Sequence, residues 1–254
     1  MNRRAFVALL AFSVATSFAP HIVAAEPATA PRLVRVLFIG NSYTYVNDLP
    51  GLVAQLLAPR GIQLEHESVT PGGATLEKQV KDGKAIAAIA QGKWDFVVLQ
   101  EQSTRPFTQP EAMFAAARLL QAEIAKTGAK TLLYETWATK AAPAEQAKLT
   151  EAYESLGREL GATVVPVGEA WKRGIAAGLE LHGPDGRHPS RLGSYLAACL
   201  FARVIAGEAI EGPPPSIVEK GAPWKSPEPA ELAKLQHLAE ETWTTLHPSA
   251  AVPR

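Results

Sequence analysis

The 254-residue chain has a single cysteine and no excess of either charge. Because Cys199 has no partner in the chain, no intrachain disulfide can form, even in an oxidising compartment. The 25 basic and 25 acidic residues balance, so the composition gives no electrostatic case for binding nucleic acid. Beyond the N-terminal region, no apolar run reaches the ~20 residues that a membrane-spanning helix needs. A disulfide-stapled scaffold is excluded, and neither a nucleic-acid-binding nor a membrane-spanning protein is favoured.

The first 25 residues have the layout of a secretory signal. Arg3-Arg4 precede an apolar run over residues 5–19, and small residues follow at 23–25. We predict cleavage after Ala25, export to the periplasm or out of the cell, and no stable membrane insertion afterwards. Because Arg3-Arg4-Ala5-Phe6 also matches the core of a twin-arginine signal, the general secretory route and the twin-arginine route both stay open. Residues 26–31 are a linker rich in Pro and Ala.

After the linker, short β-rich runs alternate with longer stretches of helical character, and there is no internal repeat. Such alternation is typical of an α/β fold with a parallel sheet and crossover helices. The expected strands are residues 33–39, 62–69, 96–100, 131–135 and 163–167. The expected helices are residues 49–58, 74–90, 110–126, 143–160, 192–205 and 230–246. A single helix after the Pro213-Pro214-Pro215 break cannot fold alone, so residues 32–254 are predicted to form one domain.

The sharpest local motif is a buried-strand pattern that ends in Gly40-Asn41-Ser42. A serine at this place projects from the C-terminal edge of the sheet. There the loops leave a crevice, and the following helix offers N–H donors. Serine also caps many turns, so the tripeptide alone does not distinguish a nucleophile from a cap.

A second motif, Asp185-Gly186-Arg187-His188, lies on a Gly- and Pro-rich segment just before a predicted helix. A serine hydroxyl becomes a good nucleophile when a base takes its proton, and an imidazole is a good base when a carboxylate fixes its tautomer and orientation. An Asp and a His three residues apart on one tight loop can meet directly. Ser42, His188 and Asp185 are therefore candidates for nucleophile, base and orienting acid. A surface histidine and a turn-forming Asp-Gly are the plain alternative.

Taken in order, these motifs resemble the sequence blocks of the SGNH (GDSL-like) hydrolase superfamily. Gly40-Asn41-Ser42 resembles the first block, with Asn41 in place of the more familiar Asp. Gly72-Gly73 resembles the second block, whose glycine donates a backbone N–H to the oxyanion, and Asp185 to His188 resembles the fifth. The resemblance implies a three-layer α/β/α, flavodoxin-like fold with a mostly parallel five-stranded sheet. It also implies hydrolysis of a carboxylic ester through an acyl-enzyme on Ser42, Asp185 and His188, with no metal or organic cofactor.

One block departs from the superfamily pattern. The third block normally ends a strand with Gly-x-Asn, whose amide donates to the oxyanion, whereas this strand runs into Gln100-Glu101-Gln102-Ser103. A glutamine amide can replace an asparagine amide as donor. We expect Gln102 in this role, then Gln100 and then Ser103, beside the backbone N–H groups of Ser42 and Gly73.

Further side chains are expected on loops at the same edge of the sheet, where they would contact the substrate. They are Asn41, Tyr43, Glu101, Arg105 and Trp137. Aromatic residues beside a sheet are more often packing, and a buried or paired acid is the alternative for Glu101. The polar strand ends favour an O-acetylated carbohydrate, either a small molecule or a polysaccharide, as the ester. Nothing in the sequence specifies an oligomeric state.

Two other functions compete with a serine esterase. His182, Asp185 and His188 repeat at three-residue spacing, which would suit a metal-dependent hydrolase if the segment were helical. The intervening Gly and Pro residues indicate a loop, and no further His or Cys cluster supplies ligands. A non-catalytic carbohydrate-binding protein on the same fold would explain the missing Gly-x-Asn, although a binding role does not require the Ser, Asp and His together.

Overall fold

A computed structural model of the protein describes residues 30–219, 221–224 and 227–248. The predicted signal peptide at residues 1–25 lies outside the described residues, as does the predicted linker apart from residues 30 and 31. The described residues from Pro31 onward belong to one compact unit. Within this part of the chain, no helix is both long enough and apolar enough to cross a membrane.

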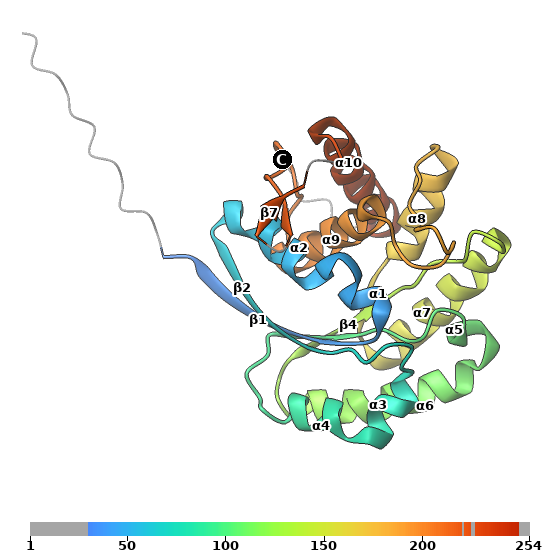
Figure 1. The fold of residues 1–254 in the computed structure, drawn as a ribbon. Helices are drawn as coiled ribbons and strands as arrows, with labels where there is room; N and C mark the ends of the chain where they lie inside the picture. Colours follow the sequence, from blue (N-terminus) through green and yellow to red (C-terminus); the bar gives the residue numbers. More distant parts are fainter. Residues whose placement is uncertain (1–29, 220, 225–226, 249–254) are drawn as a thin grey trace, which may run out of the picture. The chain divides into compact units, whose positions relative to one another are not determined.

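The centre of the fold is a five-stranded sheet, shown in Figure 1. Its strands are β1 (Arg32–Ile39), β2 (Ile62–Val69), β3 (Phe96–Leu99), β4 (Lys130–Tyr134) and β5 (Thr163–Val165). Every neighbouring pair is parallel, and the spatial order is β2-β1-β3-β4-β5. The order reverses between β1 and β3. Because ligands bind at the carboxyl ends of the strands at such a switch point, the ends of β1 and β3 are the expected place for a site.

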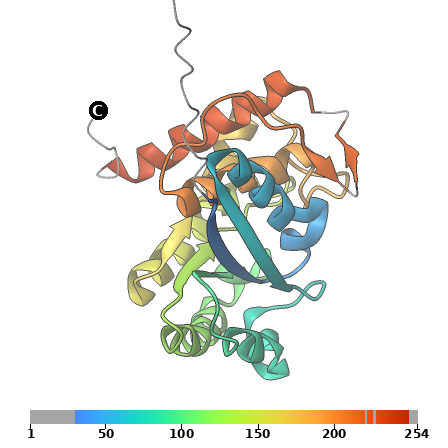
Figure 2. The ribbon, with the colours of Figure 1, turned by 90° about the vertical axis from the view of Figure 1, so that its left-hand side faces the viewer.

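Helices cover both faces of the sheet, as Figures 1 and 2 show. On one face lie α2 (Leu49–Leu57), α8 (Val167–Ala176), α9 (Arg191–Ala206) and α10 (Pro229–Leu246). On the other face lie α3 (Leu76–Asp82), α4 (Lys84–Ile89), α6 (Pro110–Ala125) and α7 (Gln146–Leu160). Successive residues of a strand point to opposite faces, so Val36 and Phe38 of β1 enter the first core while Leu37 and Ile39 enter the second. The predicted three-layer α/β/α fold is confirmed.

The local differences from prediction have identifiable causes. The single helix expected over residues 74–90 is two helices, because Gly83 adopts a left-handed φ of 71° between α3 and α4. The strand expected over residues 163–167 ends at Val165, since Pro166 then caps α8, a helix that was not predicted. Two short helices, α1 (Ser42–Tyr45) and α5 (Arg105–Thr108), and a small antiparallel pair, β6 (Val218–Glu219) and β7 (Ala222–Pro223), were also not predicted.

Candidate active site

Ser42 begins α1 directly after β1, at the switch point of the sheet. The turn that carries it is held by Asn41. The Asn41 backbone N–H donates to Gln100 Oε1 at 3.0 Å, and its Oδ1 accepts the N–H of Tyr43 at 3.1 Å. Its Nδ2 donates to the carbonyl of Ala74 at 2.9 Å. Asn41 is buried and its polar atoms are engaged within the protein, so the expected contact of Asn41 with substrate is wrong: it fixes the serine turn.

His188 joins Ser42 to Asp185 in one chain of hydrogen bonds. His188 Nε2 lies 2.9 Å from Ser42 Oγ, and His188 Nδ1 lies 2.5 Å from Asp185 Oδ2. The other carboxylate oxygen of Asp185 accepts the backbone N–H groups of Arg187 and His188. These hydrogen bonds, the one from the His188 ring first, lower the pKa of Asp185 to about 2. An imidazole that donates Nδ1–H to this carboxylate leaves Nε2 free to accept the serine proton.

Hydrogen bonds from neighbouring segments fix the loop that carries Asp185 and His188. The N–H of Gly183 donates to the carbonyl of His188 at 2.7 Å and closes the loop on itself. The indole N–H of Trp137 donates to the carbonyl of Arg187 at 2.9 Å, and the loop carbonyl at Gly186 accepts the N–H of Lys140. Two of these donors, Trp137 and Lys140, come from the segment after β4 and hold the loop in place.

Three stacked aromatic rings lie next to His188. Tyr43 stacks on Trp137 with ring centroids 4.3 Å apart, and Trp137 stacks on Trp171 at 3.9 Å. The edge of Tyr43 also meets the ring of His188. Trp137 is only 1% exposed and Tyr43 only 4%. Their expected contacts with substrate are therefore wrong, because both rings are buried among other aromatic rings next to His188.

Asn47 links the serine turn to the histidine loop, and sequence analysis did not single it out. Its side-chain amide donates to the carbonyls of Pro189 and Ser190 and to the hydroxyl of Ser194, over 2.9–3.2 Å. Asn47 has a left-handed φ of 57°, a conformation that asparagine tolerates better than most residues. The partners lie more than 140 residues away, so no local pattern could have shown this contact.

Two backbone N–H groups are available near Ser42. The loop at Gly72 and Gly73 is exposed, and the Asn41 bond to the carbonyl of Ala74 holds it beside the serine turn. Within the described part of the chain, neither Ser42 N–H nor Gly73 N–H donates to a backbone carbonyl outside the regular helices and strands. Both were expected as oxyanion donors, and the geometry leaves both able to donate.

The two glutamines after β3 differ in what their amides contact. Gln100 is fully buried, and its amide N–H groups are taken by Asn41 Oδ1 at 2.9 Å and by the carbonyl of Glu101. Gln100 therefore has no N–H left for an oxyanion, and its expectation as a donor is wrong. Gln102 is partly exposed, and its amide donates to Ser103 Oγ at 2.9 Å, which leaves a second N–H.

The two charged residues expected to contact substrate differ in what engages them. The Glu101 side chain is 0% exposed, and its carboxylate accepts backbone N–H groups of the protein, so its expected contact with substrate is wrong. Arg105 is 17% exposed and pairs with Glu77 through one nitrogen, while its Nε is buried and has no hydrogen-bond partner among the described residues. The contact of Arg105 with substrate therefore stays a prediction.

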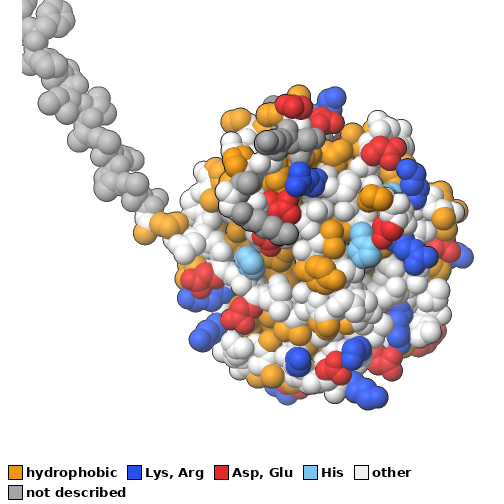
Figure 3. Space-filling view, viewed as in Figure 1, with side chains coloured by type: hydrophobic (Ala, Val, Ile, Leu, Met, Phe, Trp, Pro, Cys, Tyr) orange, Lys and Arg blue, Asp and Glu red, His pale blue; other side chains and the backbone are white. Residues whose placement is uncertain are grey.

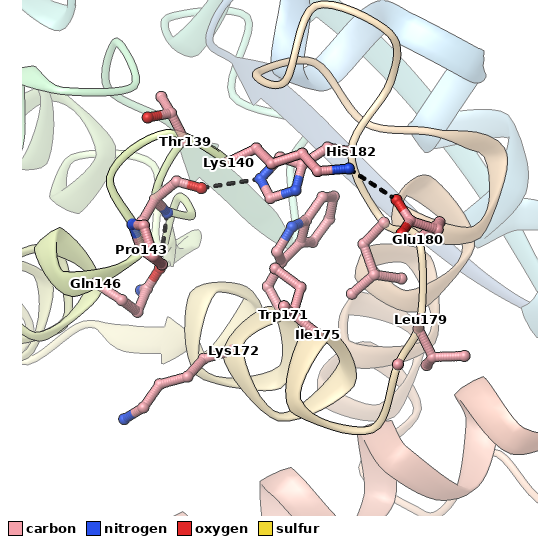
Figure 4. Close-up of a pocket in the computed structure, with 13 residues that line it drawn as sticks. Thr139, Lys140, Pro143, Gln146, Trp171, Lys172, Ile175, Leu179, Glu180 and His182 are labelled. Carbon is pink, nitrogen blue, oxygen red and sulfur yellow. Dashed lines mark hydrogen bonds and ion pairs between the residues drawn. The ribbon is translucent and has the colours of Figure 1, made fainter.

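A pocket of about 230 Å³ lies behind the histidine loop, shown in Figure 4. Trp171, the last of the three stacked rings, lines it together with His182. The ring of His182 is bonded to the carbonyl of Ala138 at 2.9 Å, and an ion pair between Lys140 and Glu180 lies at the same pocket. No three His, Cys, Asp or Glu side chains gather to hold a metal ion within the described residues.

Several solved structures are similar to this chain. A candidate SGNH hydrolase from Slackia heliotrinireducens is 30% identical, with a TM-score of 0.58 that covers 68% of this chain and 100% of that one. A lipase/acylhydrolase from Enterococcus faecalis is 18% identical, with a TM-score of 0.58 over 68% of this chain and 96% of the other. Axe2, an acetylxylan esterase from Geobacillus stearothermophilus, is 19% identical, with a TM-score of 0.56 over 69% and 95%. No family model and no curated protein matches the chain.

The chain therefore belongs to the SGNH hydrolases, a family of carboxylic ester hydrolases, and the predicted family is confirmed. Both the identity to the first structure and the sheet order support this assignment.

The face of the molecule in Figure 3 has acidic and basic side chains interspersed, without a broad field of one sign.

Proposed function

We propose that this protein is an exported serine esterase whose catalytic residues are Ser42, His188 and Asp185. The observation that carries the proposal is the continuous hydrogen-bonded chain from Ser42 Oγ through the His188 ring to the Asp185 carboxylate. This chain lies at the carboxyl edge of a parallel sheet, where α/β enzymes bind their ligands.

The geometry gives each group a step. His188 Nε2 takes the hydroxyl proton as Ser42 Oγ bonds to the ester carbonyl carbon, and the carbonyl oxygen becomes an oxyanion. His188 then gives this proton to the leaving alcohol oxygen, and the acyl group stays on Ser42. Water next attacks the acyl carbon while His188 Nε2 takes one of its protons. His188 then gives this proton to Ser42 Oγ as the bond from the acyl carbon to Ser42 breaks, so the carboxylic acid leaves and the free enzyme is restored. Asp185 remains ionised throughout, consistent with its lowered pKa of about 2.

Three donors are proposed for the oxyanion: the N–H groups of Ser42 and Gly73 and the amide of Gln102. Loss of one such donor typically lowers turnover by about 10²–10³-fold. Gln102 then takes the place of the Asn in the usual third block.

An O-acetylated carbohydrate is the proposed substrate. A pocket of about 410 Å³ is lined by Asp185 together with Lys140 and Arg187, but by neither Ser42 nor His188, so it is proposed to hold a part of the alcohol group remote from the ester bond. Such a lining suits a hydroxyl-rich alcohol group better than a long acyl chain. The acetylxylan esterase among the similar structures acts on a substrate of this class.

Hydrolysis of p-nitrophenyl acetate by the purified protein tests the mechanism, with Ser42→Ala beside the exposed serine control Ser216→Ala. We expect kcat to fall by about 10³-fold or more in Ser42→Ala, and to stay unchanged in Ser216→Ala and with a chelator. Full activity in Ser42→Ala would refute the serine mechanism, and activity lost to the chelator would indicate a metal site. A preference for octanoate over acetate would refute the acetyl-ester part alone.

Export is proposed from the arrangement of residues 1–25. Peptide sequencing of the protein from a periplasmic or culture fraction is expected to find a new N-terminus at Glu26. Accumulation of the full-length chain in the cytoplasm would contradict this proposal.

A further inference from the structure

A buried carboxylate that the triad does not use lies beside the active site. Glu101 follows β3 immediately, and none of its side chain is exposed. Both of its oxygens accept the backbone N–H of Leu76, at 3.2 and 3.3 Å. Oε1 also accepts the backbone N–H of Gln102 at 2.6 Å. One carboxylate thus joins the start of α3 to the segment after β3.

Packing alone does not explain an acid at this position. Burial of a carboxylate is costly, and an apolar side chain of similar size would avoid the cost. Burial raises the pKa of Glu101 to about 7, while hydrogen bonds from the Gln102 and Leu76 N–H groups oppose that rise. Arg105, whose charge also lowers the pKa of Glu101, forms its ion pair with Glu77. The Glu101 carboxylate is therefore compensated mainly by the two backbone N–H groups.

Both N–H groups belong to segments that carry proposed oxyanion donors. Leu76 is three residues after Gly73, and the intervening Ala74 is held by Asn41 through its carbonyl. The Gly73 loop is thus fixed from two sides, by Asn41 and by Glu101. Gln102 supplies the amide donor, and the bond from its own backbone N–H to Glu101 fixes where its side chain begins.

We infer that Glu101 is a positioning residue of the oxyanion hole, which holds Gly73 N–H and the Gln102 amide in their places relative to Ser42. The inference rests on the proposed function. Because a misplaced oxyanion donor weakens binding of the transition state more than of the ester, its loss lowers kcat and leaves KM nearly unchanged.

Glu101→Gln tests the inference, with Glu135→Gln as matched control. A glutamine has one acceptor oxygen, and its NH₂ would face a backbone donor. Glu135 is an equally buried acid just after β4, but it bonds to Thr150, Gln146 and the N–H of Glu169, away from the Gly73 and Gln102 segments. We expect kcat for p-nitrophenyl acetate to fall about 10–100-fold in Glu101→Gln, with KM within about threefold of wild type. In Glu135→Gln both constants stay within about threefold.

The pH dependence of kcat separates the effect of Glu101 from that of the other titrating groups when wild type is compared with Glu101→Gln. The titratable groups that face Glu101 are Glu77 on α3, Arg105 on α5 and Tyr153 on α7. Protonation turns one Glu101 oxygen from an acceptor into a donor, as the amide in Glu101→Gln already does. We therefore expect the ratio of wild-type kcat to Glu101→Gln kcat to be about 10–100 well above pH 7 and to fall towards one as the pH decreases through about 7.

Two results would overturn the inference: a kcat of Glu101→Gln equal to that of Glu135→Gln in folded protein, or a ratio of wild-type kcat to Glu101→Gln kcat that does not change with pH. If Glu101→Gln does not fold, as circular dichroism would show, Glu101→Asp, which keeps the carboxylate but shortens its reach, is compared with Glu135→Asp in the same assay, and equal kcat values then overturn the inference. A different result would show that the proposed function itself is wrong: Ser42→Ala would then keep its activity, whatever the activity of the Glu101 variant.

Discussion

Glu135 allows a quantitative prediction of how stability depends on pH. Its side chain is 1% exposed, and burial is the main cause that raises its pKa from 4.5 to about 7. Between these two pH values the folded protein keeps the proton while the unfolded chain releases it. The folded state then binds more protons than the unfolded state. The contribution of Glu135 to the free energy of unfolding therefore decreases as the pH rises through this window, and it is constant above it.

The rise of the pKa from 4.5 to about 7, at about 1.4 kcal/mol per pKa unit, corresponds to about 3.5 kcal/mol in full. About 3 kcal/mol of this falls between pH 4.5 and pH 8, because the unfolded carboxyl is already half ionised at pH 4.5. Glu135→Gln removes this titrating group and leaves the other acids in place. The difference between wild type and variant in how the free energy of unfolding changes with pH therefore comes from Glu135. Urea unfolding at pH 4.5 and pH 8 is the assay. We expect wild type to lose about 3 kcal/mol more than the variant between the two pH values. Parallel losses would refute the assignment of a raised pKa to Glu135.

Two further substitutions test the support of the base and the packing near it. Asp185→Asn removes the charge that stabilises the imidazolium of His188. We expect kcat/KM for p-nitrophenyl acetate to fall about 10²–10⁴-fold, while the thermal midpoint of unfolding stays unchanged. A loss of kcat/KM under threefold would contradict the role of Asp185. In Gly193→Ala the new Cβ would lie 2.3 Å from a ring carbon of Trp171 and 2.4 Å from the carbonyl oxygen of Leu181. Because the backbone oxygen cannot shift without disturbing its segment, we expect urea unfolding to show that the free energy of unfolding falls by about 1–3 kcal/mol. Unchanged stability would show that the neighbouring atoms move to make room for the new methyl group.

The elements that sequence predicted best are those with a strong local pattern. The apolar run of β1 is buried on both faces, so its extent and the serine turn at its end were readable. The helix break at Gly83 was missed because a glycine inside a helical pattern marks either an end or a tolerated residue. The start of α8 was missed because Pro166, its N-cap, falls inside the apolar run that was assigned to a strand over residues 163–167.

The candidate site was predictable where its partners are close in sequence. Asp185 and His188 share one loop, and their contact follows from their spacing. Which way a loop side chain turns depends on the tertiary fold, so sequence placed Trp137 in the substrate site although it packs in the stack of aromatic rings next to His188. The roles of Gln100 and Gln102 were likewise separable only once the amide partners of each were known.

The most direct test of the proposed mechanism is reaction of the protein with a fluorophosphonate, followed by intact mass measurement and peptide mapping. An activated serine attacks phosphorus and displaces fluoride, which leaves a stable adduct. We predict one adduct per chain, on Ser42, that is absent in Ser42→Ala and appears in parallel with loss of p-nitrophenyl acetate hydrolysis. An unlabelled Ser42 in protein that still hydrolyses the ester, or an adduct on another residue that abolishes hydrolysis, would contradict Ser42 as the nucleophile.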